Sequence, residues 1–227
     1  YKSIYESLTI SGAAHRTKVN VLKVDAEKID DKNAAKIIGE VDGILIPGGF
    51  GDRGIEGKIE AARYAREQKI PFFGICLGMQ IATIEFARNV CGLAEANSTE
   101  FTKDSPHPVI CLQEEQQGVT DMGGSMRLGS CESILIAGTK SHKLYGGANR
   151  IHERHRHRYE FNSDYQNQLQ EAGLVIASVS EKEGLVEIIE NPDHPFFVAA
   201  QFHPEFKSKP NLPHPLFFGF MEACLNR

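Results

Sequence analysis

Apolar and polar positions follow two different periods along the first half of the chain. Residues 43–47 and 70–75 form continuous apolar runs, a pattern typical of short strands that are buried on both faces. Residues 18–24 alternate between polar and apolar side chains, which predicts another strand. Apolar residues recur at helical spacing in four further segments, 1–15, 34–41, 55–68 and 77–90. Strands that alternate with helices in this way predict an α/β fold with a mostly parallel central sheet flanked by helices.

The second half of the chain consists of shorter alternating segments separated by turn residues. It predicts additional strands, some of them antiparallel, at 107–112, 125–138, 154–161, 174–180, 184–190 and 196–202, and helices at 165–173 and 215–225. No linker, repeat or low-complexity segment interrupts the chain, so we expect one domain over residues 1–227. A doubly wound domain usually opens on a strand, whereas this chain opens on a helix. We therefore expect that the first strand of the domain is missing from it.

Composition and charge argue against several classes of function. The net charge is −5 and charges of both signs are well mixed, so no nucleic-acid partner is expected. No apolar run is long enough to span a bilayer and no signal-peptide pattern opens the chain, which predicts a cytoplasmic protein without membrane contact. The five cysteines are widely spaced and include no C-x-x-C pair, so we expect reduced thiols rather than disulfides or a zinc site.

Histidines and arginines alternate in residues 152–158, a pattern that could suggest a metal site. Three arginines are interleaved with the three histidines, and their positive charge would disfavour a divalent cation. We therefore expect no metal here and interpret the basic strip as a surface for anion recognition.

The sequence GICLG at 74–78 places Cys76 between an apolar strand and a helix. The G-x-C-x-G pattern resembles a nucleophile elbow, in which small residues permit a sharp strand-to-helix turn. At a helix N-terminus the partial positive charge favours a thiolate, and the first backbone N–H groups can stabilise an oxyanion. A buried structural cysteine would fit the same local pattern, so this motif alone leaves both interpretations open.

A nucleophilic cysteine needs a base, and the sequence offers one at QFHPEF, after the apolar segment 196–202. His203 and Glu205 are two positions apart, so in an extended segment both side chains would face the same side. Glu205 could then hold the ring of His203 while its other nitrogen meets the sulfur of Cys76. A surface histidine beside a solvated glutamate is the alternative. Because Cys76 and His203 both follow predicted parallel strands, the combination favours a catalytic triad.

The glycine-rich stretch PGGFGDRGIEGK at 47–58 fits G-x-G-x-x-G only formally. The next predicted strand ends in Cys76 instead of an acidic residue, and the Walker A spacing fails at Asp52 and Ile59. We interpret the loop as a nest of backbone N–H groups beside Cys76 that completes an oxyanion hole.

The motifs PGGFG, GICLGMQ and HPE resemble the three motif blocks of the class I (triad) glutamine amidotransferases. That resemblance implies a flavodoxin-like amidotransferase fold and a glutaminase reaction, in which Cys76 attacks the side-chain amide of L-glutamine. His203 would transfer protons and Glu205 would orient it. The substrate and oxyanion residues implied by the resemblance are Gly48, Gly49, Leu77, Gln80, Glu100, Arg158 and Tyr159. Among these, Glu100 would meet the α-ammonium group of glutamine and Arg158 would bind glutamine together with Tyr159.

Five longer blocks, PGGFGDRGIEGK, ANSTEF, MGGSMRLG, ERHRHRYEFN and QFHPEF, resemble one branch of this family. In that branch the domain supplies ammonia to an N-terminal synthase domain, which aminates UTP to CTP in pyrimidine biosynthesis. The resemblance implies that ATP and magnesium bind only in that absent synthase domain, that GTP is an allosteric activator, and that the full-length protein is a homo-oligomer, a tetramer in the family. MGGSMRLG resembles part of a lid involved in this activation.

Two alternatives remain open from the sequence. The chain could be the glutaminase domain of another triad amidotransferase, such as a GMP synthase or anthranilate synthase subunit, although ANSTEF and RHRHRYEF argue against those. It could also be a catalytically silent regulatory module of the same fold.

Overall fold

The computed structural model describes residues 1–112 and 126–227. Its helices are α1 (Lys2–Ala14), α2 (Ala34–Ile38), α3 (Ile55–Glu67), α4 (Leu77–Asn89), α5 (Lys140–Leu144), α6 (Gln166–Glu171) and α7 (Pro215–Leu225), with short 3₁₀ turns at Ala26–Lys28, Ser163–Tyr165 and Pro204–Phe206. Its strands are β1 (Ile44–Ile46), β2 (Phe72–Ile75), β3 (Ala96–Ser98), β4 (His107–Leu112), β5 (Arg127–Leu135), β6 (Arg150–His157), β7 (Tyr159–Phe161), β8 (Val175–Ser180), β9 (Val186–Glu190) and β10 (Phe197–Ala200).

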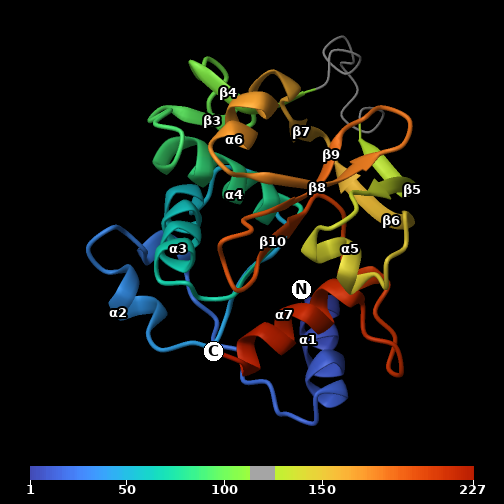
Figure 1. Ribbon diagram of the computed structural model, residues 1–227. Coiled ribbons are helices and arrows are strands. Elements are labelled where there is room, and N and C mark those ends of the chain that lie inside the picture. Colours follow the sequence, from blue (N-terminus) through green and yellow to red (C-terminus); the bar gives the residue numbers. More distant parts are fainter. Residues whose placement is uncertain (113–125) are drawn as a thin grey trace.

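Two sheets organise the described part of the chain (Figure 1). The larger has seven strands in the order β1-β2-β10-β9-β8-β5-β6, and the smaller has three in the order β3-β4-β7. β1, β2 and β10 are parallel, whereas β9, β8, β5 and β6 continue the larger sheet through antiparallel pairs. The predicted α/β fold with additional antiparallel strands is therefore confirmed, and in the described residues parallel pairing in the larger sheet is confined to three strands.

The apolar strands contribute side chains to two hydrophobic cores, one on each face of the larger sheet. Alternate residues of β2 point to opposite faces, so Phe72 packs into the core under α3 and α4 while Phe73 packs into the core under α1 and α7. The same division holds on β10, where Phe197 and Val198 belong to different cores. Figure 1 shows α1 and α7, from opposite ends of the chain, lying side by side.

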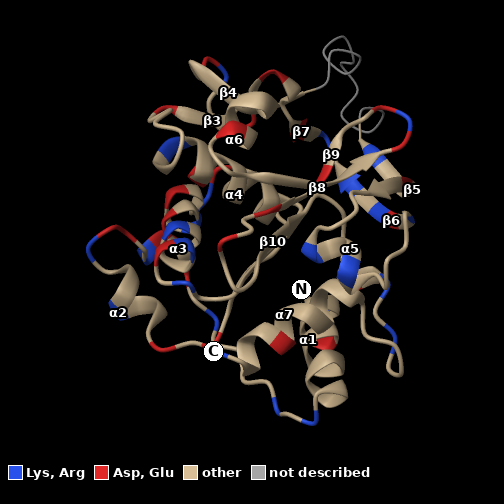
Figure 2. Cartoon of the chain, in the orientation of Figure 1, with Lys and Arg blue, Asp and Glu red and all other residues tan. Residues whose placement is uncertain are grey.

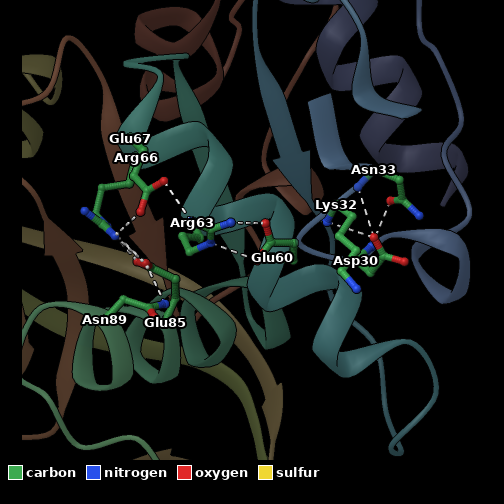
Figure 3. Close-up of polar contacts among 9 residues, drawn as sticks. All are labelled: Asp30, Lys32, Asn33, Glu60, Arg63, Arg66, Glu67, Glu85 and Asn89. Atoms are coloured by element: carbon green, nitrogen blue, oxygen red, sulfur yellow. Dashed lines mark hydrogen bonds and ion pairs between the residues drawn. The ribbon is translucent and has the colours of Figure 1, made fainter. Parts of the chain in front are cut away.

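A buried ion pair fixes α4, the helix that follows Cys76, against α3. Arg66 on α3 donates two hydrogen bonds to Glu85 on α4, at 2.8 and 3.0 Å to the same carboxylate oxygen, and Asn89 donates to it from the next turn (Figure 3). The side chain of Glu85 is completely buried, so its charge is compensated within the protein rather than by water. This pairing sets the position of α4 relative to the rest of the fold.

The strand predicted at 18–24 is wrong, because these residues have no regular secondary structure. A strand needs a hydrogen-bonded neighbour, and in the described chain β1 pairs with β2 only. Residues 17–24 instead line one side of a cavity of about 670 Å³ whose other side includes Leu45 of β1. Apolar side chains such as Leu22 are left exposed there. The missing first strand remains a prediction.

Three further elements differ from the sequence pattern. Residues 154–161 were predicted as one strand, but the chain changes sheets within them: β6 belongs to the larger sheet, β7 to the smaller, and Arg158 lies between. β3 and α5 were not predicted, because three- and five-residue elements carry too little periodicity to detect. The strand expected at 125–138 is found as β5, and the part of MGGSMRLG before position 126 lies outside the described residues.

Candidate active site

Cys76 lies at a strained turn between β2 and α4. Its backbone has φ 51° and ψ −103°, a conformation that residues with a Cβ atom rarely adopt. The flanking glycines are needed for packing: a Cβ on Gly74 would lie 2.6 Å from the carbonyl oxygen of Gly78, and a Cβ on Gly78 would collide with the backbone of Ile46. The backbone N–H of Cys76 donates to Ala200 at the end of β10, 2.7 Å away. The predicted elbow is therefore present.

The thiol of Cys76 is buried, with 3% of the residue exposed. Burial raises the pKa of the thiol to about 12, while the backbone N–H of Leu77 acts in the opposite direction. The carboxylates of Glu205, Glu160 and Glu100 contribute to this rise in pKa, to a smaller extent than burial does. The expected influence of the helix N-terminus is present, but burial outweighs it. At neutral pH the resting thiol is protonated, so a base is needed to form the nucleophile.

His203 is oriented by Glu205, as the sequence predicts. The Nδ1 of His203 lies 2.8 Å from Oε1 of Glu205, and the backbone N–H of His203 donates to the carbonyl oxygen of Arg154 on β6. Glu205 is in the 3₁₀ turn Pro204–Phe206, so a turn rather than the expected extended segment brings the two side chains together. Nε2 of His203 is buried and has no hydrogen-bond partner among the described residues, which leaves it free for the thiol.

Gly48 lies between the side chains of His203 and Cys76. A Cβ placed on Gly48 would be 2.9 Å from Cε1 of His203 and 3.5 Å from Cβ of Cys76, so the two side chains converge on this glycine. A Cβ on Gly49 would be 3.1 Å from the side chain of Leu77. The loop after β1 and the start of α4 are therefore neighbours, which is the arrangement that the predicted oxyanion hole requires.

The residues expected to hold the substrate occupy the side of the site near the smaller sheet. Gln80, from the first turn of α4, donates to the carbonyl oxygen of Tyr159 at 3.0 Å. The carboxylate of Glu100 accepts from the backbone N–H of Gly51 at 3.1 Å. Burial raises the pKa of Glu100, whereas Gly51 and the charge of Arg158 lower it, which places Arg158 within electrostatic reach of Glu100. The acid and the arginine expected to bind glutamine therefore interact electrostatically.

Gln201 also lies at this site, although the sequence did not predict it. Its side-chain amide lies 3.7 Å from Sγ of Cys76, and its Oε1 accepts from Gln80 at 3.4 Å. The only available signal was its position, two residues before His203 at the end of β10. Gln201 therefore links Cys76 to Gln80, which in turn donates to the backbone of Tyr159.

The basic strip of β6 is divided between two environments. Residues of β6 are alternately exposed and buried, so Arg154 and Arg156 face solvent whereas His155 and His157 point inward. Figure 2 shows the cations gathered on β5 and β6. No group of three or more histidine, cysteine or acidic residues in the described ranges could hold a metal ion. All five cysteines are free thiols.

Comparison with known proteins places this site in a family. The model of the class I glutamine amidotransferase family matches residues 1–223, so the chain belongs to that family. The predicted family is confirmed.

Within the family the chain is similar to CTP synthases. It is 57% identical over 226 residues to the CTP synthase of Caldanaerobacter subterraneus and 56% identical over 225 residues to that of Trichlorobacter lovleyi. These alignments cover 100% and 99% of this chain but only 42% of each relative, so the chain spans about two-fifths of their length. Its similarity to their glutaminase part, predicted from the sequence, is confirmed by a solved domain.

That solved structure is the Trypanosoma brucei CTP synthase glutaminase domain with bound acivicin. It superposes with a TM-score of 0.94 at 40% identity and covers 100% of this chain and 88% of the other. A putative GMP synthase subunit from Thermoplasma acidophilum has a TM-score of 0.63 at 16% identity, covers 98% of this chain and 88% of the other, and shares the fold alone. No helix in the described part of the chain is long and apolar enough to cross a membrane.

Proposed function

We propose that this domain hydrolyses L-glutamine to glutamate and ammonia through a cysteine thioester, with Cys76, His203 and Glu205 as its catalytic triad. The observation that carries the proposal is the strained elbow at Cys76, which faces His203 across Gly48 while Glu205 fixes the imidazole. These are the nucleophile, base and orienting acid of a covalent acyl transfer.

The first half-reaction begins when Nε2 of His203 takes the proton of the Cys76 thiol as its sulfur attacks the side-chain amide carbon of glutamine. Backbone N–H groups around Gly48, Gly49 and Leu77 stabilise the resulting oxyanion. The tetrahedral intermediate collapses when the protonated His203 gives its proton to the amide nitrogen, which leaves as ammonia. A γ-glutamyl thioester on Cys76 remains.

The second half-reaction uses water as the nucleophile. His203 takes a proton from water, the hydroxide attacks the thioester carbon, and the sulfur leaves and recovers its proton from His203. Glutamate is released and the enzyme is restored. Through both steps Glu100 would pair with the α-ammonium group of the substrate, and Arg158 with Tyr159 would bind its α-carboxylate, because an acid and a cation together match a zwitterion.

In the longer protein we propose that the ammonia is used by an N-terminal synthase domain for the ATP-dependent amination of UTP to CTP. The similarity of the whole chain to two-fifths of bacterial CTP synthases supports this. ATP and magnesium would bind in the synthase domain and GTP would activate the glutaminase step. We further propose a cytoplasmic homo-oligomer as the working form, without a nucleic-acid partner.

Covalent labelling with 6-diazo-5-oxo-L-norleucine, an electrophilic glutamine analogue, tests the glutaminase site. The expected result is one adduct, mapped by peptide mass spectrometry to Cys76 and slowed by excess glutamine. Cys76→Ala should abolish the adduct, and Cys111→Ala is the matched control that should keep it. A protein that releases no glutamate and is not labelled at Cys76, even as the complete polypeptide, would be a silent module and would refute the proposal.

A further inference from the structure

Behind the proposed glutamine site, five ionisable side chains form one buried network: Arg127, His155, His157, Glu160 and Glu187. Nε2 of His155 donates to Oε2 of Glu187 at 2.7 Å, and Nη1 of Arg127 lies 2.6 Å from Oε1 of the same carboxylate. Arg127 also lies 3.5 Å from Oε1 of Glu160, which accepts from Nε2 of His157 at 2.6 Å. The side chain of Arg127 is 12% exposed and the other four are 3% exposed or less. The five side chains form a single chain of polar contacts.

This network holds the two sheets together where the chain crosses between them. Glu187 is on β9 and His157 ends β6, both in the larger sheet, whereas Glu160 is on β7 in the smaller sheet. Arg127 on β5 contacts a carboxylate from each sheet. Between His157 and Glu160 lie Arg158 and Tyr159, the two residues proposed to bind glutamine. The contact between His157 and Glu160 therefore closes a short loop around both of them.

The other end of the network reaches the nucleophile. The backbone carbonyl oxygen of Glu187 accepts from the backbone N–H of Gln201 at 2.9 Å, and the side chain of Gln201 lies 3.7 Å from Sγ of Cys76. Gln80 donates to Gln201 and also to the carbonyl oxygen of Tyr159. The network and the two glutamines, Gln80 and Gln201, thus connect Cys76 with the segment that carries Arg158 and Tyr159.

Stability alone is a weak reason for burying these charges. Burial would raise the pKa of Glu187, but His155 and Arg127 hold it below its usual value, so the carboxylate is charged and depends on these partners. Replacing such a network by apolar residues of similar volume is often neutral or stabilising, whereas removing one partner is costly. What a paired network adds is a fixed geometry for the segments that it joins.

We propose that this network is a positioning device that sets the affinity for glutamine, with Glu160 as the positioning residue that fixes Arg158 and Tyr159 between the two sheets. The inference rests on the proposed glutaminase function. Neither Glu160 nor Arg127 need touch the substrate. The network acts through the short loop that presents the two binding residues.

Glu160→Gln in the complete polypeptide tests this inference, because it keeps the volume and removes the charge that faces Arg127. We expect the KM for glutamine in glutamate release to rise about tenfold, since small displacements of binding groups have large effects, while kcat changes less than about threefold. Labelling by 6-diazo-5-oxo-L-norleucine at low concentration should slow by about the same factor as KM rises. Alkylation of Cys76 by iodoacetamide needs no amino-acid pocket and should not slow, because the Glu160 charge that this variant removes raises the pKa of the thiol in the wild type.

Glu153→Gln is the matched control. Glu153 is an equally buried glutamate on β6 whose side-chain carboxylate contacts Tyr145, His214 and Lys207, none of which belongs to the network. Its contact with His155 is made by the backbone carbonyl oxygen, which Glu153→Gln retains. Glu153→Gln should lower the melting temperature as much as Glu160→Gln does and leave the KM for glutamine unchanged. Equal KM values in Glu160→Gln and wild type, or equal increases in both variants, would overturn the inference and reduce the network to a structural role.

A second variant guards against misfolding of the first. Arg127→Lys keeps the positive charge but removes the guanidinium group whose Nη1 lies near both carboxylates, so it should reproduce the rise in KM. An unchanged KM in a folded Arg127→Lys protein also overturns the inference. If wild-type protein is not labelled at Cys76, the proposed function fails and the inference with it, whereas a labelled wild type with normal KM in both variants overturns the inference alone.

Discussion

The strain at Cys76 can be measured by comparing two variants, Cys76→Ala and Cys76→Gly. Alanine keeps the Cβ atom in the conformation with φ 51° and ψ −103°, whereas glycine adopts positive φ at little steric cost. The alanine variant should therefore retain the backbone strain of the elbow, and the glycine variant should release it. Both remove the thiol, so differences between them do not involve its chemistry.

The magnitude follows from a control at a buried alanine with ordinary backbone geometry. Ala199 on β10 is completely buried and pairs with Gly74 next to the elbow. Ala199→Gly should lower the free energy of unfolding by about 1.5 kcal/mol, from about 0.8 kcal/mol for one buried methyl group and about 0.5–1 kcal/mol for glycine flexibility. A residue held in a rarely populated conformation stores about 1–3 kcal/mol. The free energy of unfolding of Cys76→Gly should therefore differ from that of Cys76→Ala by between about −0.5 and +1.5 kcal/mol, where a positive value means that the glycine variant is more stable.

Urea unfolding followed by far-UV circular dichroism gives both differences on one scale, provided that the slopes agree among the variants. If the elbow is strained, replacing alanine by glycine should lower the free energy of unfolding by about 1–3 kcal/mol less at position 76 than at position 199. A loss at position 76 equal to that at position 199 would show that the elbow stores no strain and would refute the argument.

Two other predictions concern the thiol and the open edge of β1. Because the pKa of the Cys76 thiol is raised to about 12, its alkylation by iodoacetamide without glutamine should speed up about tenfold per pH unit from about pH 8 to about pH 11. An alkylation rate that no longer changes with pH above neutral pH would contradict a thiol that is protonated at neutral pH. In the described chain β1 is an edge strand whereas β2 is paired on both sides, so amide hydrogen exchange should be faster in β1 than in β2. Equal exchange rates in the two strands would contradict an open edge at β1.

Local patterns were sufficient to predict much of this structure. The helix expected at 215–225 has the observed bounds of α7. The elbow was predicted from the two glycines around Cys76, although the backbone of Ile46, outside the motif, is one reason why Gly78 is needed. The pairing of His203 with Glu205 was also predicted, since two residues are enough to define it, although a turn rather than a strand produces it. Short-range sterics leave a clear trace in sequence.

Features that depend on distant partners could not be predicted. Residues 18–24 have the alternation of a strand but no neighbour to pair with in the described chain, and pattern alone cannot reveal a missing neighbour. The change of sheet at Arg158 left no signal, because β6 and β7 continue one alternating run. This run was interpreted as a basic strip for anion recognition, and nothing in it indicated that His155 and His157 contact carboxylates that lie 32 and three positions further along the chain.

Burial by distant segments raises the pKa of Cys76, although the local motif predicts that the helix N-terminus lowers it. A helix N-terminus favours the thiolate, but here the first N–H of α4 is outweighed by burial and by three carboxylates contributed by distant segments. A preformed thiolate would therefore be an uncompensated buried charge, whereas transfer of its proton to His203 creates a thiolate and an imidazolium together. That pair gains from Glu205 on one side and from backbone N–H groups on the other. This geometry favours proton transfer in concert with attack on the substrate, so we propose that His203 acts as a base in the first step rather than as a permanent counter-ion.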